Sequence, residues 1–178
     1  MLFALAQSAA ADAGGTFVPV PGGQFQSILK YEDSIGSRHV DAFQLMQTPV
    51  TNAEFLDFVT AQPAWRRDRI APVSAEPGRD LRHWQDAAEL GATALPDQPV
   101  VHVSWFAASA YCESRQARLP TWQEWEFAAA ADETRRDARK DPLWRERILG
   151  WYAKPATVPL AAVGRSAANV FGVKDLHG

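Results

Sequence analysis

The chain has 178 residues, the size of one ordinary domain with room for a buried core. Hydrophobic residues make up 47% and charged residues 22%, which excludes a wholly disordered chain. The formal net charge of -3, with arginines scattered or beside acids, excludes a nucleic-acid-binding surface of the usual basic kind. Seven tryptophans and nine phenylalanines beside twelve prolines predict many short elements and ordered loops held by aromatic side chains.

The N-terminal residues 1–15 are apolar and rich in alanine. Small residues in Ala-x-Ala spacing at Ala9–Ala11 and Ala11–Ala13 are typical of a signal-peptide cleavage site, although basic residues are missing before the apolar run. We interpret 1–15 as the remnant of a signal peptide or a disordered leader, which favours a periplasmic or secreted protein. No run approaches the roughly 18 apolar residues that a membrane span needs.

Two stretches near the start have the pattern of strands. Residues 16–25 alternate apolar and small side chains around two prolines, which predicts an edge strand followed by a turn at Gly22 and Gly23. A second strand is expected within 38–46, where Val40 and, weakly, Ala42 compete with the set of Phe43 and Leu45 for the buried face.

The next element is a helix with a defined start. Thr51 and Glu54 have the spacing of a capping box, in which each side chain accepts the other residue's backbone N–H. The helix should end near Pro63, and its buried face should carry Phe55, Phe58 and Val59.

The middle of the chain is expected to be mostly irregular. Residues 65–98 read as a long ordered surface loop with one short helix in 80–91. Residues 100–103 are expected to form a short strand that leads into a helix capped by Ser104. One side of that helix should carry Trp105, Ala108, Tyr111, Cys112 and Arg115.

A tryptophan- and glutamate-rich motif, RLPTWQEWE, covers Arg118, Leu119, Pro120 and Thr121 and continues to Glu126. Thr121 and Glu124 again have capping-box spacing, so Glu124 is expected to be an N-cap partner and Trp125 a core residue. Glu126 has no assigned role. Because residues two apart on a helix face different directions, the two glutamates are not expected to share a proton or a metal.

The last part of the chain, from residue 132, begins with many charged residues and ends with a turn-rich stretch. Residues 132–147 are expected to form an exposed helical or irregular segment broken at Pro142, and 148–164 short extended pieces. The end of the chain is turn-rich around Asn169 and Gly172.

Few side chains suggest chemistry. Cys112 is the only cysteine and is expected to be buried and inert. His102 is expected to be a hydrogen-bonded, partly buried side chain rather than a ligand. Asn169 and Asp175 have oxygens that suit calcium, and turn formation accounts for them equally well.

Five motifs in this order resemble the formylglycine-generating enzyme (sulfatase-modifying factor) domain family, which has ergothioneine-synthesis, pyoverdine-maturation and nitrite-reductase accessory relatives. They are FVPVPGGQF, TPVTNAEFLDFV, QPVVHVSWFAASAYC, RLPTWQEWEFAAAA and AANVFGVKDLHG, all within 16–178. The family's usual central motif is RLPTEAEWE, so Trp122 and Gln123 depart from it. The resemblance implies an α+β, C-type-lectin-like fold with short strands, two or three helices and long ordered loops.

The resemblance also implies a function and raises an alternative. Family enzymes bind copper with a cysteine pair near the C-terminal end and oxidise a client cysteine with oxygen; calcium is a further possible cofactor. Cys112 matches neither cysteine, and the ergothioneine-type activity is not expected because no histidine set of that kind occurs. We expect a C-terminally incomplete domain of such an enzyme, with no catalytic, cofactor or metal residue of its own. The alternative is a non-catalytic accessory or binding module that assists maturation of an exported metalloenzyme.

Overall fold

The computed structural model describes residues 2, 4–6, 15–28, 36–75, 78–155 and 159–177, with Leu5 and Ala6 described by their backbone only. Within these residues the chain forms an α+β fold with four α-helices and short antiparallel strands. The larger sheet has the strand order β2-β5-β1-β6, and β3 pairs with β4 in a separate two-stranded sheet. The strands are β1 Leu5–Ala6, β2 Phe17–Val20, β3 Gly23–Phe25, β4 Arg38–Val40, β5 Phe43–Met46 and β6 Ala117–Arg118.

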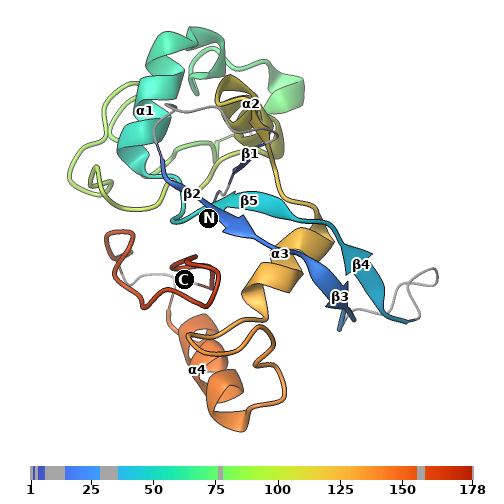
Figure 1. Cartoon of the computed structure of the whole chain (residues 1–178). Coiled ribbons are helices and arrows are strands. Elements are labelled where there is room, and N and C mark those ends of the chain that lie inside the picture. Colours follow the sequence, from blue (N-terminus) through green and yellow to red (C-terminus); the bar gives the residue numbers. More distant parts are fainter. Residues whose placement is uncertain are drawn as a thin grey trace.

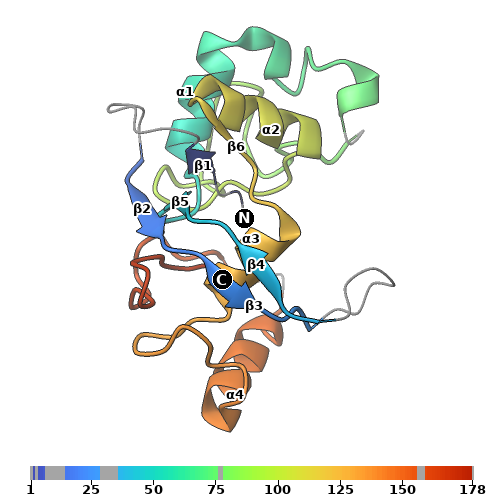
Figure 2. The same cartoon turned by 45° about the vertical axis from the view of Figure 1, so that its right-hand side comes forward.

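Two of the helices lie at one end of the molecule and one at the other, with the remaining helix between them (Figure 1). They are α1 Asn52–Ala61, α2 Trp105–Ser114, α3 Trp122–Ala129 and α4 Pro142–Tyr152, with 3-10 turns at Pro63–Trp65 and Pro72–Ser74. In Figure 1, α1 and α2 lie side by side above the larger sheet, and α4 lies at the opposite end of the molecule. The same separation is seen in the turned view of Figure 2. Among the described residues, no helix has the length and apolar content that crossing a membrane requires.

The first residues of the chain belong to the larger sheet. β1 pairs with both β5 and β6, and the side chains of Leu2 and Ala4 are buried. The N–H of Met46 donates to the carbonyl of Ala4 at 2.9 Å, and the N–H of Val50 donates to that of Leu2 at 2.8 Å. The expected domain start at residue 16 is therefore corrected: residues 2 and 4–6 lie within the fold. The Ala-x-Ala stretch lies outside the described residues, so export remains a prediction.

The strand predictions are confirmed at one place and corrected at another. β2 is an edge strand, as expected, because it pairs only with β5. The single strand expected in 38–46 is two strands, β4 and β5. The chain bends between them against Gly22, where a Cβ atom would lie 2.3 Å from the carbonyl oxygen of Val40. Only glycine permits this approach, and its φ of +67° also favours glycine.

The core beside α1 and α2 confirms the first helix prediction. Thr51 and Glu54 form the expected capping box, and Phe55, Phe58 and Val59 are buried. Phe55 stacks on Tyr111 of α2 with ring centroids 5.7 Å apart. These contacts join the two helices into one aromatic core, which is the arrangement that large side chains favour.

The segment between α1 and α2 is a long loop, but two elements expected near it are absent. Residues 80–91 form turns and one isolated bridge, Asp86 with Glu89, in place of a helix. Residues 100–103 form no strand, although Val100 donates to the carbonyl of Val50 at 2.9 Å. The extended backbone ends at His102, because this residue has a φ of 54° and its carbonyl accepts from the N–H of Leu81 at 2.7 Å. Its side chain is exposed, which corrects the expectation of partial burial.

The predictions for the last third are corrected at α4. Pro142 is the first residue of this helix, and Asp141 caps it by accepting from the N–H of Leu143. Proline favours that position because the first helical N–H has no helical partner. Ile148–Tyr152, expected to be extended, are helical, and the helix count exceeds the expected two or three.

Candidate functional site

The RLPTWQEWE motif forms the start of α3, with the expected second capping box. The hydroxyl of Thr121 accepts from the N–H of Glu124 at 3.2 Å, and the N–H of Thr121 donates to the Glu124 carboxylate at 2.7 Å. Arg118 adds a bidentate ion pair with Glu124 at 2.6 and 2.8 Å. Burial raises the pKa of Glu124, but the bonds from Arg118 and Thr121 outweigh it and hold the pKa below its usual range. This carboxylate is a structural anion.

Glu126 is the buried carboxylate of the motif and ties α3 to the segment after β3. It accepts from the hydroxyl of Ser27 at 2.6 Å, the N–H of Ile28 at 2.8 Å and the indole of Trp122 at 3.1 Å. Nη1 of Arg139 lies 3.6 Å from Oε1 of Glu126, the oxygen that also accepts from Ile28. Because a buried charge is stable only when paired and hydrogen-bonded, these donors give a role to the residue that sequence left unassigned.

The aromatic side chains around the two helix starts are more exposed than expected. Trp125 is half-buried, which corrects its assignment to the core; its ring lies 6.0 Å from those of Trp122 and His177. Trp105 is 66% exposed and does not share the buried side of α2. Ser104 does cap that helix, as expected, by accepting from the N–H of Ala107.

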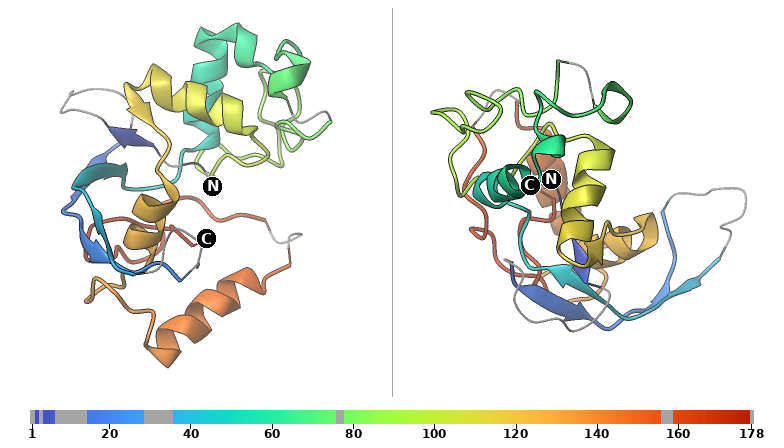
Figure 3. Two further views of the ribbon diagram at one scale, coloured as in Figure 1. Left: turned by 90° about the vertical axis from the view of Figure 1, so that its right-hand side faces the viewer. Right: turned by 90° about the horizontal axis from the view of Figure 1, so that it is seen from above.

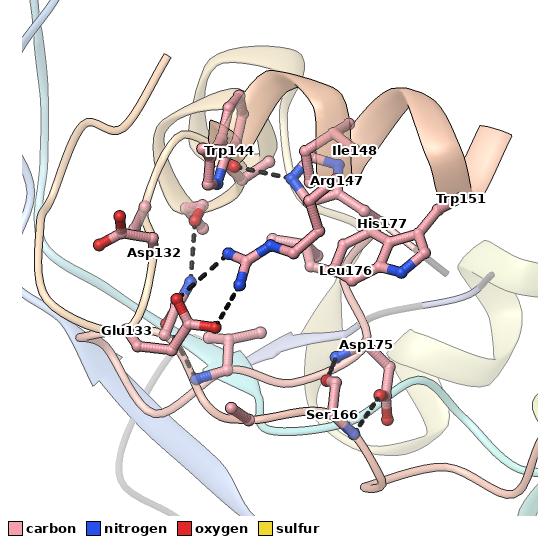
Figure 4. A pocket seen from close by; sticks show the side chains of 16 residues that line it. Asp132, Glu133, Trp144, Arg147, Ile148, Trp151, Ser166, Asp175, Leu176 and His177 are labelled. Atoms are coloured by element: carbon pink, nitrogen blue, oxygen red, sulfur yellow. Dashed lines mark hydrogen bonds and ion pairs between the residues drawn. The ribbon is translucent and has the colours of Figure 1, made fainter. Parts of the chain in front are cut away.

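The strongest candidate site is a cavity of about 330 Å³ between the end of α3, the face of α4 and the last described residues (Figure 4). We call it the α4 cavity. Small side chains of α3 and the following turn form one wall, and α4 forms another. The lining is Ala128, Ala129, Ala131, Asp132, Glu133, Trp144, Arg147, Ile148, Trp151, Ser166, Ala167, Asn169, Val173, Asp175, Leu176 and His177.

His177 lies within a group of aromatic rings at this cavity. The centroids of Trp125, Trp144, Trp151 and Tyr152 are 5.7 to 6.4 Å from that of its imidazole. Its Nε2 pairs with the carbonyl of Ala129 at 2.8 Å, so Nε2 carries the hydrogen. Burial lowers the pKa of His177, and the ring is therefore neutral at pH 7. Within the described part of the chain, its Nδ1 is buried without a hydrogen-bond partner.

The charged groups at the α4 cavity are already paired. Glu133 binds Arg147 in a bidentate ion pair at 2.6 and 3.1 Å. Asp132 accepts from the N–H groups of Thr134 and Arg135 and from the Arg135 guanidinium. These hydrogen bonds, with that of Arg135 first, outweigh burial and lower the pKa of Asp132. The loop before α4 is thus fixed by carboxylates that have no free oxygen for acid–base work.

The possible calcium ligands also serve the backbone. Asn169 accepts from the N–H groups of Phe171 and Val173, and Asp175 accepts from those of Gly164 and Ser166. The turn interpretation of these residues is therefore the one that the contacts support.

The described residues do not fit a redox metal. No group of three or more His, Cys, Asp or Glu side chains converges anywhere in the ranges that the structure describes. Cys112 is buried in α2, and burial raises the pKa of its thiol to about 12, so it is not a thiolate ligand at neutral pH. Copper has no site among these residues.

Sequence reasoning singled out Asn169 and Asp175 but missed the other residues at the α4 cavity, although a periodic pattern was present. Trp144, Ile148 and Trp151 are spaced i, i+4 and i+7, which places them on one helical face. Reading Pro142 as a helix breaker concealed this face. The position of His177 against α4 depends on long-range contacts and has no local sequence pattern.

Comparison with known proteins assigns the family. Residues 2–178 match the sulfatase-modifying factor enzyme 1-like domain, and the chain belongs to this family. The match begins at residue 2, in agreement with the place of β1 in the larger sheet.

Three relatives illustrate the range of the family. The chain is 32% identical to the hercynine oxygenase of Mycobacterium tuberculosis over 152 residues, covering 73% of this chain and 35% of that protein. It is 33% identical to the formylglycine-generating enzyme of Streptomyces coelicolor over 144 residues, 63% of this chain and 46% of that protein. The inactive C-alpha-formylglycine-generating enzyme 2 of Bos taurus is 30% identical over 143 residues, 63% of this chain and 48% of that protein. The matched part spans less than half the length of each relative.

Proposed function

We propose that the chain is the scaffold part of a formylglycine-generating enzyme that oxidises a cysteine of a client polypeptide. The observation that carries the proposal is the match to the sulfatase-modifying factor family over residues 2–178. Similarity to a relative named formylglycine-generating enzyme, at 33% identity, supports this reaction in particular.

The proposed reaction converts a –CH2–SH side chain into an aldehyde. One oxygen atom of O2 ends in the aldehyde, and the sulfur leaves as hydrogen sulfide. Two thiols supply the two electrons and two protons that reduce the other oxygen atom to water, and they become a disulfide. Copper is the cofactor proposed for the full-length protein, but Cys112 cannot hold it, so its thiol ligands have to come from other residues.

The test uses the natural full-length protein together with a client polypeptide that carries a cysteine. An aldehyde-reactive hydrazide probe and mass spectrometry of the client measure the product. We expect aldehyde in the client, none in a client with serine at that position, and unchanged product with Cys112→Ser. Hercynine supplied with oxygen and a thiol is the competing substrate, since 32% identity links the chain to a hercynine oxygenase. Oxygenation of hercynine without client aldehyde would refute the proposal.

The second candidate is a non-catalytic accessory module that assists maturation of an exported metalloenzyme. The carboxylates of Glu124, Glu126 and Asp132 are all engaged in hydrogen bonds or ion pairs, which favours a structural role for them over a catalytic one. The similarity to a relative whose name calls it inactive also favours this second candidate. Stable co-purification with an exported metalloenzyme, together with failure to form aldehyde or to oxygenate hercynine, would favour this function.

Two finer features belong to the same proposal. The α+β arrangement is consistent with a C-type-lectin-like fold, which an experimental structure of the full-length protein would test. Export to the periplasm or the medium is proposed from the alanine-rich start of the sequence. Cell fractionation of the native protein with an antibody measures it, and a cytoplasmic fraction alone would refute it.

A further inference from the structure

A second, larger cavity lies beside the two-stranded sheet. Its volume is about 670 Å³. Gly22 to Ile28 form one side, and the loop between α3 and α4 forms the other. Figure 3 (left) shows this orange loop beside the blue strands. We call this cavity the β3 groove; its lining also includes Ser37, Phe127, Arg136, Asp137, Arg139 and Lys140.

The floor of the β3 groove is rigid and partly aromatic. The guanidinium of Arg139 lies 4.4 Å from the ring centroid of Phe25 and donates to the carbonyl of Gln26 at 2.8 Å. Phe25 meets Phe127 edge to face at 5.6 Å. The loop is therefore fastened to the strand by a cation–π contact and a hydrogen bond, so the groove is formed before any ligand binds.

The rim of the β3 groove carries net positive charge. Asp137 is bound by Arg139 at 2.8 and 2.9 Å, so these two charges compensate each other. Arg136 and Lys140 are exposed and form no salt bridge among the described residues, although Lys140, after Arg139, helps to lower the pKa of Asp137. Three cations and one carboxylate leave the rim with net positive charge in a chain whose formal net charge is -3, which favours an anionic ligand.

The outer edge of β3 is open to another strand. In the described residues β3 pairs only with β4, and Gly22 and Gly23 bring no side chain over the backbone. Further along, the carbonyl of Gln26 and the N–H of Ile28 are already bonded to Arg139 and Glu126. An unpaired strand edge is a template for an added strand, and here the open part is limited to β3, because Gly22 before it is buried.

We propose that the β3 groove binds an extended acidic segment of a partner polypeptide. Successive side chains of a strand point to opposite faces, so alternating acidic and apolar residues present one carboxylate face and one apolar face. The carboxylates pair with Arg136 and Lys140, and the apolar side chains pack on Ile28, which is 71% exposed and lines the groove. Nucleic acid fits less well, because a phosphate chain needs more cations than this rim carries in a chain of net negative charge.

The probe is a fluorescein-labelled peptide of alternating aspartate and valine, with the asparagine–valine peptide as its uncharged counterpart. Binding to the full chain is measured by fluorescence anisotropy at low and high salt. The test variant is Arg136→Glu with Lys140→Glu. The matched control is Arg79→Glu with Arg145→Glu, which makes the same charge change at exposed sites away from the groove.

We expect the aspartate peptide to bind the natural chain and the asparagine peptide to bind at least several-fold less well. The test variant should lose about tenfold in affinity, as expected for two exposed ion pairs replaced by repulsion, and the control about twofold or less. Hydrogen exchange should slow within β3 when the peptide is saturating. No binding by the natural chain, equal loss in the control, equal binding of the uncharged peptide, or tighter binding of oligothymidine would each overturn the proposal. Circular dichroism confirms that both variants fold.

Discussion

Replacing Glu126 by alanine should destabilise the fold more than any other change in the RLPTWQEWE motif. Glu126 is 4% exposed and accepts three hydrogen bonds, from Ser27, Ile28 and Trp122. A hydrogen bond to a charged group contributes about 1.5–3 kcal/mol net. Ser27 and the 51% exposed Trp122 can turn to water, but the N–H of Ile28 and the nearby Arg139 lose a buried acceptor. We therefore expect Glu126→Ala to cost about 3 kcal/mol.

Two further variants separate the charge from the shape. Glu126→Gln keeps one acceptor oxygen for Ile28 and loses the charge, so we expect a cost of about 1.5 kcal/mol. Gln123→Ala lies on the exposed face of the same helix, and a surface change of this kind should stay within about 0.5 kcal/mol. Urea unfolding followed by far-ultraviolet circular dichroism gives the three free energies, with constant m values as the check on two-state behaviour. If Glu126→Ala costs less than about 1 kcal/mol, the hydrogen bonds do not stabilise the fold as argued.

Other stability differences follow from burial and charge. Phe55→Ala should cost about 3–5 kcal/mol in the same urea assay, because Phe55 is 1% exposed. Trp105→Ala should stay within about 0.5 kcal/mol, because Trp105 is 66% exposed. Equal costs for the two variants would contradict the different burial of these two side chains. Trp125→Ala should fall between them, near 2 kcal/mol, because the indole is half-buried; a cost as large as that of Phe55→Ala would restore its assignment to the core. Burial, followed by His102, Arg67 and Arg82, lowers the pKa of His83 from 6.5 to about 4. The unfolded chain then binds a proton that the folded chain does not, so the contribution of His83 to stability is complete above pH 6.5 and falls as the pH drops toward 4. The urea midpoint should fall less over this range in His83→Gln, and an unchanged pH dependence would contradict the lowered pKa.

Local chemistry explains which elements could be predicted from the sequence. The starts of α1, α2 and α3 depend on cap residues three positions before their partners, so Thr51, Ser104 and Thr121 identified them. The buried face of α1 follows from side-chain spacing alone. For these elements the sequence neighbours supply the main interactions.

The errors occur where distant contacts decide the backbone. The stretch before α2 has the valines of a strand, yet the bond from the N–H of Leu81 to the carbonyl of His102 turns it away from a sheet. Leu5–Ala6 looked like part of a leader, and pairing with β5 and β6 makes it a strand. Propensity is weaker than such tertiary contacts, so neither outcome could be read from local pattern.

The α4 cavity shows the same limit at a candidate site. Its α4 face has a helical spacing that sequence does contain, at Trp144, Ile148 and Trp151. The partner of that face, His177, comes from the other side of a long turn-rich segment. Its neutral state follows from burial and from the bond to Ala129, which are both properties of the folded chain.

The acidic side chains of the motif constrain where any chemistry can occur. A general acid or base has to gain and lose a proton during the reaction. Protonation of Glu124 would weaken its bond to Arg118 and the capping box, so proton transfer there would be coupled to loss of the contacts that hold the start of α3. The oxygens of Glu126 are occupied by donors from Ser27, Ile28 and Trp122, which would have to move before a substrate could reach them. Because both carboxylates are engaged in this way, the proposed oxidation is expected to take place with other groups.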